Sequence, residues 1–348
     1  MLGMLRVLVI VWVALGIGYG EATAQVAGRY TFSFLNLPNN ARIAGLGGLN
    51  TALAKGHPDV NLFSQNPALL DSTQHQQLGV NFNPYFAGIS NTSVHYAHQS
   101  AKAGTWGFGL HFVNYGTIQQ TDDAGNVLGS FQANDFALTT AYAHQVNHFR
   151  FGFSLKLIGS QLAGYNAYAL GFDLGVIFKH PEKDFVAAVV FKNVGFPVSG
   201  FVDYQSIVLP FDARLGIAYK PAFMPFRFHV TIYQLYEYDV NSRIGNAQAT
   251  GATTQNQPGS LADNLFRHLA FGGELLISRN FQLRVGYNHQ IRQDLRWANG
   301  GLGMAGFSVG LMIRVKAFEF SYTLAGYHPV ALQNFFTLNT HFTSLKKR

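Results

Sequence analysis

The stretch from Phe149 to Leu157 reads FRFGFSLKL, so Phe or Leu occupies every second position and Arg, Gly, Ser and Lys lie between. A period of two is the signature of a β-strand, because successive side chains point to opposite faces. The same alternation recurs at residues 211–220, 226–232, 281–288 and 307–316. The sequence therefore predicts a protein built mainly from strands.

The two faces of these expected strands differ sharply in composition. One face carries Phe, Leu, Val, Ile and Tyr, and the other carries Gly, Ser and Asn with scattered charge. A soluble sandwich would bury the apolar face and cover the other with Lys and Glu. Small polar residues opposite apolar ones instead fit a barrel that is apolar outside, in lipid, and polar inside, with aromatic girdles at both interfaces.

The composition agrees with a β-rich protein that meets lipid on one face. Charged residues make up 12% of the 348 residues, against about 25% in typical soluble domains, and aromatic residues make up 14%. This content excludes a disordered chain. The absence of Cys excludes a disulfide framework and a cysteine metal site. A mean hydropathy of +0.09 is too low for a bundle of membrane helices.

Residues 1–24 have the pattern of a secretory signal peptide. Arg6 precedes an apolar core at residues 7–20, and residues 22–24 (ATA) match a small-x-small cleavage site that would leave Gln25 first. A membrane anchor is the alternative, which the short core and the cleavage pattern disfavour. No long apolar run follows, since the stretch from Phe185 to Phe191 is too short to span as a helix.

The alternation predicts fourteen strands, an even number as bacterial single-chain barrels require. They are expected at residues 76–84, 91–99, 104–115, 129–146, 148–162, 165–179, 183–193, 210–220, 225–236, 265–279, 280–291, 303–316, 317–327 and 335–343.

The expected connections alternate between short and long along the whole chain. Short ones are residues 99–103, 146–147, 180–182, 221–224, 279–280 and 315–317. Longer ones are residues 116–135, 159–166, 194–209, 237–264, 292–302 and 326–334. Tight periplasmic turns and longer outer loops give this rhythm in a transmembrane barrel, whereas a Greek-key sandwich would not keep it. We therefore expect an outer-membrane barrel at residues 76–348 with both termini in the periplasm.

A barrel of this size encloses a lumen that its own side chains do not fill. Residues 25–75 lack the strand alternation, so we expect them to form a hatch inside the lumen; a free periplasmic extension is the alternative. Residues 40–55 predict a short helix interrupted by Gly45, Gly47 and Gly48, and Asn66 and Pro67 begin a tight turn. These five residues are expected to shape or gate the hatch.

Six basic residues fall on the inward phase of the strands, where they could line an anion path or pair with inward acids and the hatch. We favour pairing, with Asp173, Asp212, Glu274 and Glu319 as partners. The basic residues are Arg150, Lys156, Arg214, Arg227, Arg284 and Arg314.

No motif predicts catalysis, a cofactor or a metal site. The thirteen His form no zinc-binding spacing, and His95 and His98 point to opposite faces of one strand, where we expect interface or loop histidines. The glycines at 45–48 lack the strand and the Lys-Ser/Thr pair of a phosphate loop. The net charge of +7 forms no basic stripe with interleaved aromatics, so we expect no nucleic-acid partner. We expect a protein that is not an enzyme.

A set of segments, in order, resembles the PorQ family of outer-membrane barrels in the type IX secretion system, within the wider PorV and FadL group. The resemblance spans residues 28–342. The segments are residues 30–32 (YTF), 37–48 (LPNNARIAGLGG), 66–70 (NPALL), 114–116 (NYG), 121–126 (TDDAGN), 181–185 (PEKDF), 192–195 (KNVG) and 209–212 (LPFD).

The resemblance implies a fourteen-stranded FadL-like barrel with an N-terminal hatch, in a surface attachment complex with PorU, PorV and PorZ. In that complex PorU is the sortase, and the barrel has no catalytic role and holds a PorZ-like surface protein. A FadL-like transporter of hydrophobic ligands is the alternative, which a strand kink near residues 171–175 or at Pro84 would favour. A general diffusion porin is a third possibility.

Overall fold

The computed structural model describes residues 30–54, 58–100, 104–201, 207–237, 261–295, 303–328 and 331–342. The expected signal peptide at residues 1–24 and most of the expected loop at 237–264 lie outside these residues. Among the described residues, no helix is both long and apolar enough to cross a membrane.

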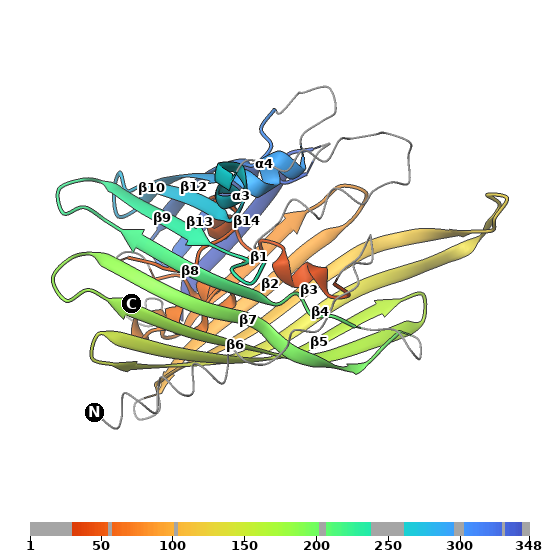
Figure 1. Ribbon diagram of the computed structural model, residues 1–348, viewed down its shortest axis with the longest axis horizontal. Coiled ribbons are helices and arrows are strands. Elements are labelled where there is room, and N and C mark those ends of the chain that lie inside the picture. The colour runs from red at the N-terminus through yellow and green to blue at the C-terminus, as the bar shows by residue number, and fades with distance from the viewer. Residues whose placement is uncertain are drawn as a thin grey trace.

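The described strands close into one antiparallel barrel, in which each strand pairs with its neighbours in sequence and β1 pairs with β14 (Figure 1). The strands are β1 (Gln77–Pro84), β2 (Ser90–Ser100), β3 (Gly104–Thr121), β4 (Val127–Val146), β5 (Phe149–Leu162), β6 (Tyr165–Lys179), β7 (Phe185–Ser199), β8 (Asp212–Tyr219), β9 (Phe226–Ile232), β10 (Leu269–Leu275), β11 (Phe281–Asn288), β12 (Phe307–Val315), β13 (Phe318–Ala325) and β14 (Gln333–His341). The expectation of a fourteen-stranded antiparallel barrel is confirmed.

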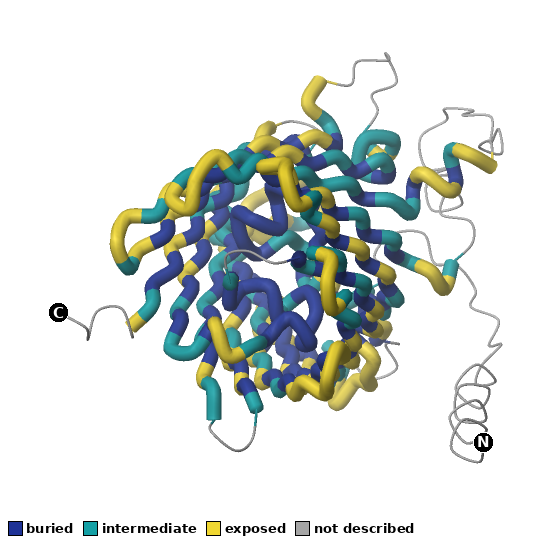
Figure 2. The backbone as a smooth tube through the Cα atoms, turned by 90° about the vertical axis from the view of Figure 1, so that its left-hand side faces the viewer, coloured by how far each residue is buried: buried dark blue, intermediate teal, exposed yellow. Residues whose placement is uncertain are grey.

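The wall is inverted relative to a soluble protein, as the alternation predicts. On β5, Phe151 is 50% exposed on the outside, while Arg150 and Lys156 are each 5% exposed on the inside. The tube in Figure 2 alternates in the same way between buried and exposed positions along most strands. Exposed apolar side chains on every second position form the surface that a transmembrane barrel turns towards lipid.

Three of the expected connections are wrong. Residues 116–135 are not a long loop, because β3 and β4 continue to a tight turn at residues 122–126. β5 and β6 likewise run to a turn at Ala163 and Gly164, where a longer connection was expected. β7 extends to Ser199, well past the expected end at residue 193. Turn-forming residues such as Gly116 and Asn193 mark bulges inside these strands rather than strand ends.

Two rims follow from the topology. We call the rim where β1 begins and β14 ends the base rim, and the opposite rim, with the β3–β4 turn, the loop rim. Two short helices, α3 (Leu261–Arg267) and α4 (His289–Asp294), lie beside each other where β9, β10 and β11 reach the loop rim (Figure 1). Each helix begins or ends in a connection that the sequence predicts as a loop, but residues 265–267 and 289–291 are predicted as strand and are helical instead.

The segment before β1 runs inside the barrel, where Figure 2 shows a buried tube surrounded by the wall. We call residues 30–74 the hatch. It contains one α-helical turn and four 3₁₀ turns: η1 (Ser33–Asn36), α2 (Ala41–Ala44), η2 (Val60–Ser64), η3 (Pro67–Leu69) and η4 (Ser72–Gln74). The expected placement of an N-terminal hatch in the lumen is confirmed.

Candidate functional site: the hatch and the wall around it

Asparagine side chains cap the turns of the hatch. Asn40 Oδ1 accepts a hydrogen bond from the Ile43 amide at 2.9 Å and so begins α2. Asn66 Oδ1 accepts from the Ala68 amide at 3.0 Å, and Pro67 occupies the first position of η3, where its missing N–H costs nothing. The expected tight turn at Asn66 and Pro67 is therefore a capped 3₁₀ turn.

Gly45, Gly47 and Gly48 lie directly after α2. Gly47 and Gly48 have φ values of +84° and +82°, which side-chain-bearing residues rarely adopt. A Cβ on Gly47 would lie 3.0 Å from the carbonyl oxygen of Tyr287, and one on Gly45 would lie 3.0 Å from Thr323 Oγ1. Gly45 and Gly47 bring the hatch backbone against β11 and β13, and Gly48 packs on the Tyr327 ring.

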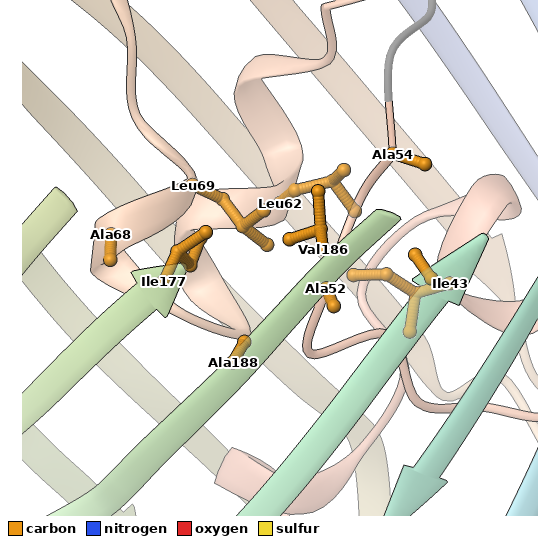
Figure 3. Packing of buried hydrophobic residues seen from close by; sticks show 10 residues of the cluster. Ile43, Ala52, Ala54, Leu62, Ala68, Leu69, Ile177, Val186 and Ala188 are labelled. Atoms are coloured by element: carbon orange, nitrogen blue, oxygen red, sulfur yellow. The ribbon is translucent and has the colours of Figure 1, made fainter. Parts of the chain in front are cut away.

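The two groups of predicted hatch residues do not meet. Gly45 and Gly47 face β11 and its neighbours and Gly48 faces the Tyr327 ring, whereas Asn66 and Pro67 face β5 and β6. They form two separate contacts between the hatch and the wall. Between them lies an apolar cluster in which Ile43, Ala52 and Leu62 of the hatch pack with Val186 and other wall residues (Figure 3).

Wall glycines create the space that the hatch occupies. A Cβ on Gly152 would lie 2.1 Å from the Ala68 nitrogen, and one on Gly286 would lie 2.1 Å from the Gly47 nitrogen. Both distances are far below van der Waals contact, so the hatch backbone lies directly on the wall backbone. The inward glycines that the hatch approaches through backbone or side-chain atoms are Gly79, Gly107, Gly109, Gly152, Gly175, Gly216, Gly272 and Gly286.

An ion cluster joins the centre of the hatch to β10. Arg42 Nη2 lies 3.0 Å from Glu274 Oε1, and Arg42 Nη1 lies 3.7 Å from Asp59 Oδ2. Glu274 also contacts Arg227 and, at 3.1 Å, Arg284. Burial lowers the pKa of Arg42, but the carboxylates of Glu274 and Asp59 outweigh it, so the pKa is raised and the hatch carries a fixed positive charge.

Each of the six inward basic residues has an acidic partner, and the predicted pairing is confirmed. Arg227 and Arg284 share Glu274, and Arg150 reaches Asp71 of the hatch at 3.2 Å. The other pairs are Lys156 with Asp173, Arg214 with Asp212 and Arg314 with Glu319. These basic residues serve the wall and the hatch instead of a continuous anion path.

A second polar contact joins the hatch to β1, β2 and β14. Asn61 Nδ2 donates to Asn339 Oδ1 at 2.8 Å, and Asn61 Oδ1 accepts from Asn81 Nδ2 at 2.8 Å. His95 Nδ1 lies 3.0 Å from the same Asn61 oxygen. The expectation that His95 is an interface or loop histidine is therefore wrong, because its ring is buried in the lumen against the hatch.

Apolar side chains form a further cluster inside the barrel, where the hatch begins. Phe32 and Phe34 of the hatch pack against Ile158 of β5 and against Ile207 and Leu209, which precede β8. All five are at most 8% exposed. The Thr31 amide also donates to the Val208 carbonyl at 3.3 Å, so the start of the hatch is tied to this segment. We call these five residues the inner apolar cluster.

The wall is interrupted beside the inner apolar cluster. Between Phe172 and Leu174 of β6, the single residue Asp173 faces both Lys192 and Asn193 of β7. Asn193 has a φ of +55°, and Lys156 Nζ donates to its Oδ1 at 2.7 Å. This bulge falls within the expected kink region at residues 171–175, whereas β1 and β2 pair in unbroken register as far as Pro84.

Beyond the bulge, β7 loses its partner on one side. Its pairing with β8 ends at Lys192 and Asp212, while residues 194–199 pair only with β6 in the described part of the chain. We call this interruption the wall break. It is flanked by outward-facing apolar residues, of which Phe196 is 53% exposed. The sequence does not predict the break, because it predicts that β7 ends at residue 193 and that residues 194–209 form a loop.

No group of three or more His, Asp or Glu side chains among the described residues is placed to hold a metal ion.

No protein-family model matches the chain, and no curated protein matches it. Among solved structures it is similar to the TodX monoaromatic hydrocarbon channel deltaS2 mutant, with 12% identity over 87% of this chain and 97% of that one, at a TM-score of 0.48. It is similar to a Pseudomonas aeruginosa FadL homologue, with 10% identity over 87% and 98% of the two chains, at 0.47. It is also similar to the KdgM porin, with 8% identity over 76% of this chain and 98% of that one, at a TM-score of 0.32. This chain's own strand pairing defines the fourteen-stranded barrel.

Proposed function

We propose that this protein is a non-enzymatic outer-membrane barrel through which small hydrophobic compounds pass, with the hatch controlling the route. The observation that carries the proposal is that the inner apolar cluster lies beside the wall break. The hatch also meets the wall through other apolar clusters and through ion pairs and backbone contacts, and what distinguishes the inner apolar cluster is its place beside the wall break. An apolar interior next to an incomplete wall suits a compound that leaves water on one side and enters lipid on the other.

The membrane setting of this proposal follows from the outer surface. Strands cross a membrane as a closed barrel with apolar side chains on its outward positions, and this chain has both features. The base rim, with its short turns, would face the periplasm, and the loop rim would face outwards.

The wall break fits the route because backbone that lacks a strand partner is tolerated at membrane depth only where it faces protein or a cavity. Ile207 and Leu209 pack in one cluster with Phe34 and precede β8, whose pairing with β7 ends at the break, so displacing them would open the lumen towards lipid. The glycine turn at Gly47 and Gly48 and the capped turn at Asn66 would hold the rest of the hatch in place.

Purified protein in liposomes tests this function. Uptake of radiolabelled toluene and of radiolabelled oleate should saturate with concentration and exceed that of protein-free liposomes. Planar-bilayer conductance should stay low, because the hatch fills the lumen. Uptake equal to that of empty liposomes for both compounds would refute the proposal, and a large steady conductance would indicate a diffusion porin.

A second candidate function is docking of a surface protein, as the PorQ-like segments imply. The observation that favours it is the β3–β4 hairpin, which projects past the rest of the loop rim (Figure 1). A barrel with this role would hold a PorZ-like partner close to PorU and PorV. Recovery of such a partner with the intact barrel, but not with a variant whose hairpin is shortened, would support it.

A further inference from the structure

The outer part of the β3–β4 hairpin stands free of the barrel. β2 pairs with β3 only as far as Asn114, and β5 pairs with β4 only as far as Ala133. Beyond these points, residues 117–121 and 127–132 pair with each other, and no other described strand pairs with either edge. The hairpin therefore presents two open strand edges above the loop rim.

Open edges are normally protected, because an unpaired strand accepts another strand. Proteins place Lys, Pro or inward charges on such edges to prevent this. Residues 115–132 contain no Lys, Arg or Pro. Val127 and Leu128 are instead 62% and 65% exposed, on a surface above the apolar wall. The hairpin thus has features of a strand acceptor and lacks the Lys and Pro that prevent pairing, and its one bulge beyond Thr117 lies at the tip end, at Leu128.

The two edges are not equivalent. A groove of about 430 Å³ runs along the β4 edge, between the hairpin and the β5–β6 turn. Its lining includes Ser130, Gln132, Gln161 and Gly164 and holds no charged side chain. The Gln132 carbonyl accepts a bond from the Ala163 amide at 3.4 Å, so its backbone groups point away from β3. By alternation, the N–H and C=O of Ser130 also point into the groove.

The distribution of charge along the chain indicates which kind of partner the hairpin would attract. Residues 103–149 carry Asp122, Asp123 and Asp135 but no Lys, Arg or Glu, although the whole chain has a net charge of +7. The hairpin and its strands therefore carry −3 and the remainder +10. Asp122 and Asp123 lie at the exposed tip, where an anionic lipid surface would be repelled and a basic peptide attracted.

We propose that the β4 edge at residues 127–131 binds an extended, basic segment of a surface protein as an added strand. The Ser130 backbone would exchange hydrogen bonds with that segment, alternate side chains would enter the groove, and Lys or Arg would face the acidic tip. The inference rests on the docking role as the second proposed function and specifies its site and partner.

Peptide binding to the full-length protein in detergent tests this surface. The probes are an acetylated peptide with alternating Lys and Val or Thr (TKVKTKVK) and a matched peptide with Glu in place of each Lys (TEVETEVE). We expect the Lys peptide to bind at least about tenfold more tightly and to protect the Ser130 amide from hydrogen exchange. Equal binding of the two peptides, or no binding of either, would overturn the proposal.

Proline substitutions on the two edges give a matched pair. Ser130→Pro removes an N–H that faces the groove and leaves the β3–β4 hydrogen bonds in place. It should weaken binding of the Lys peptide by about tenfold. Gln119, which lies opposite Ser130, has its N–H on the other edge, so Gln119→Pro should leave binding unchanged. The reverse pattern would place the partner on β3 and contradict the assignment.

Two further outcomes separate this surface from its alternatives. If wild-type protein sediments as a dimer and Ser130→Pro as a monomer, the edge pairs with a second copy of this chain and the basic-partner proposal is wrong. If a surface partner is recovered equally well with wild type and Ser130→Pro, the docking role stands but this edge does not carry it.

Discussion

Arg42 in the hatch and Glu274 on β10 form an ion pair at 3.0 Å at a point where both side chains are almost fully buried. Glu274 also balances Arg227 and Arg284. The Glu274 carboxylate therefore neutralises two arginines of the wall and also holds Arg42 of the hatch. Because both depend on Glu274, the position of the hatch and the stability of the barrel are coupled.

Glu274→Gln should destabilise the barrel strongly. It leaves Arg42, Arg227 and Arg284 buried without their shared carboxylate, a situation that costs about 3–5 kcal/mol. Arg42→Met should cost less, because Glu274 retains two guanidinium partners. Urea unfolding in detergent, followed by the heat-dependent gel shift of folded barrels, measures both. A smaller loss for Glu274→Gln than for Arg42→Met would contradict this ordering.

Gly152→Ala should displace the hatch from β5. Its Cβ would lie 2.1 Å from the Ala68 nitrogen, and such overpacking costs about 1–3 kcal/mol or more. Since the chain has no Cys, a single Ala68→Cys reports exposure of the hatch through its rate of thiol labelling. Gly273→Ala is the control, because its Cβ would meet only Val285 Cγ2, at 3.4 Å. Faster labelling in the Gly152 variant alone is expected; equal rates in all three proteins would show that the contact is unimportant.

Asn193→Val should destabilise the β6–β7 bulge more than Asn193→Gly does. Asn193 has a φ of +55°, which a β-branched residue tolerates poorly and Gly tolerates well. Both variants lose the bond from Lys156 to the Asn193 side chain, so the difference of about 1–3 kcal/mol that we expect between them reflects the backbone strain alone. The measurement is the unfolding midpoint of each variant, and a Val variant as stable as the Gly variant would argue against a structural role for this bulge.

Acid should loosen α3 from α4. Asp263 bonds to Arg267 at 2.9 Å and to His289 at 2.9 Å. Partial burial raises the pKa of Asp263, but these bonds outweigh it and leave the pKa below its ordinary value of 3.8. The stabilising contribution is therefore complete above that value and is lost as the pH falls through the lower pKa of the folded state.

Hydrogen exchange of α3 amides at pH 6 and pH 3 checks this dependence, after correction for the intrinsic exchange rate. Protection should fall on acidification in the wild type. In Asp263→Asn, which cannot titrate, protection should be low at both pH values. A wild type that is equally protected at both values would contradict the role of the Asp263 carboxylate.

The sequence predicted the barrel well because the alternation of its strands is strong and covers most of the chain. β6 was expected at residues 165–179, and the structure has the same bounds. The ends of β3 and β7 were expected too early, since Gly116 and Asn193 resemble turn residues and the pattern does not reveal that pairing continues past a bulge.

The contacts of the hatch could not be predicted in the same way. The alternation predicts that Gly152 and Gly286 face the lumen. The absence of a side chain at these positions does not predict which part of the chain will pack against them. Arg42 was not singled out, because nothing in the sequence near it identifies Glu274, 232 positions later, as its partner. The wall break depends on β7 continuing past the point where its pairing with β8 ends, a property of strand pairing that no local pattern encodes.

Uptake of radiolabelled oleate by liposomes that contain Leu209→Asn tests the central claim most directly. Leu209 belongs to the inner apolar cluster, so a polar side chain there should reduce the initial uptake rate by about tenfold relative to wild type. Phe153→Asn, on the outer face of β5, is the control and should retain the rate, with the folded fraction of each protein checked by its gel shift. Uptake that is saturable in wild type, lost in the Leu209 variant and kept in the Phe153 variant is the predicted result. Equal uptake by folded wild type and folded Leu209→Asn would contradict passage through the inner apolar cluster.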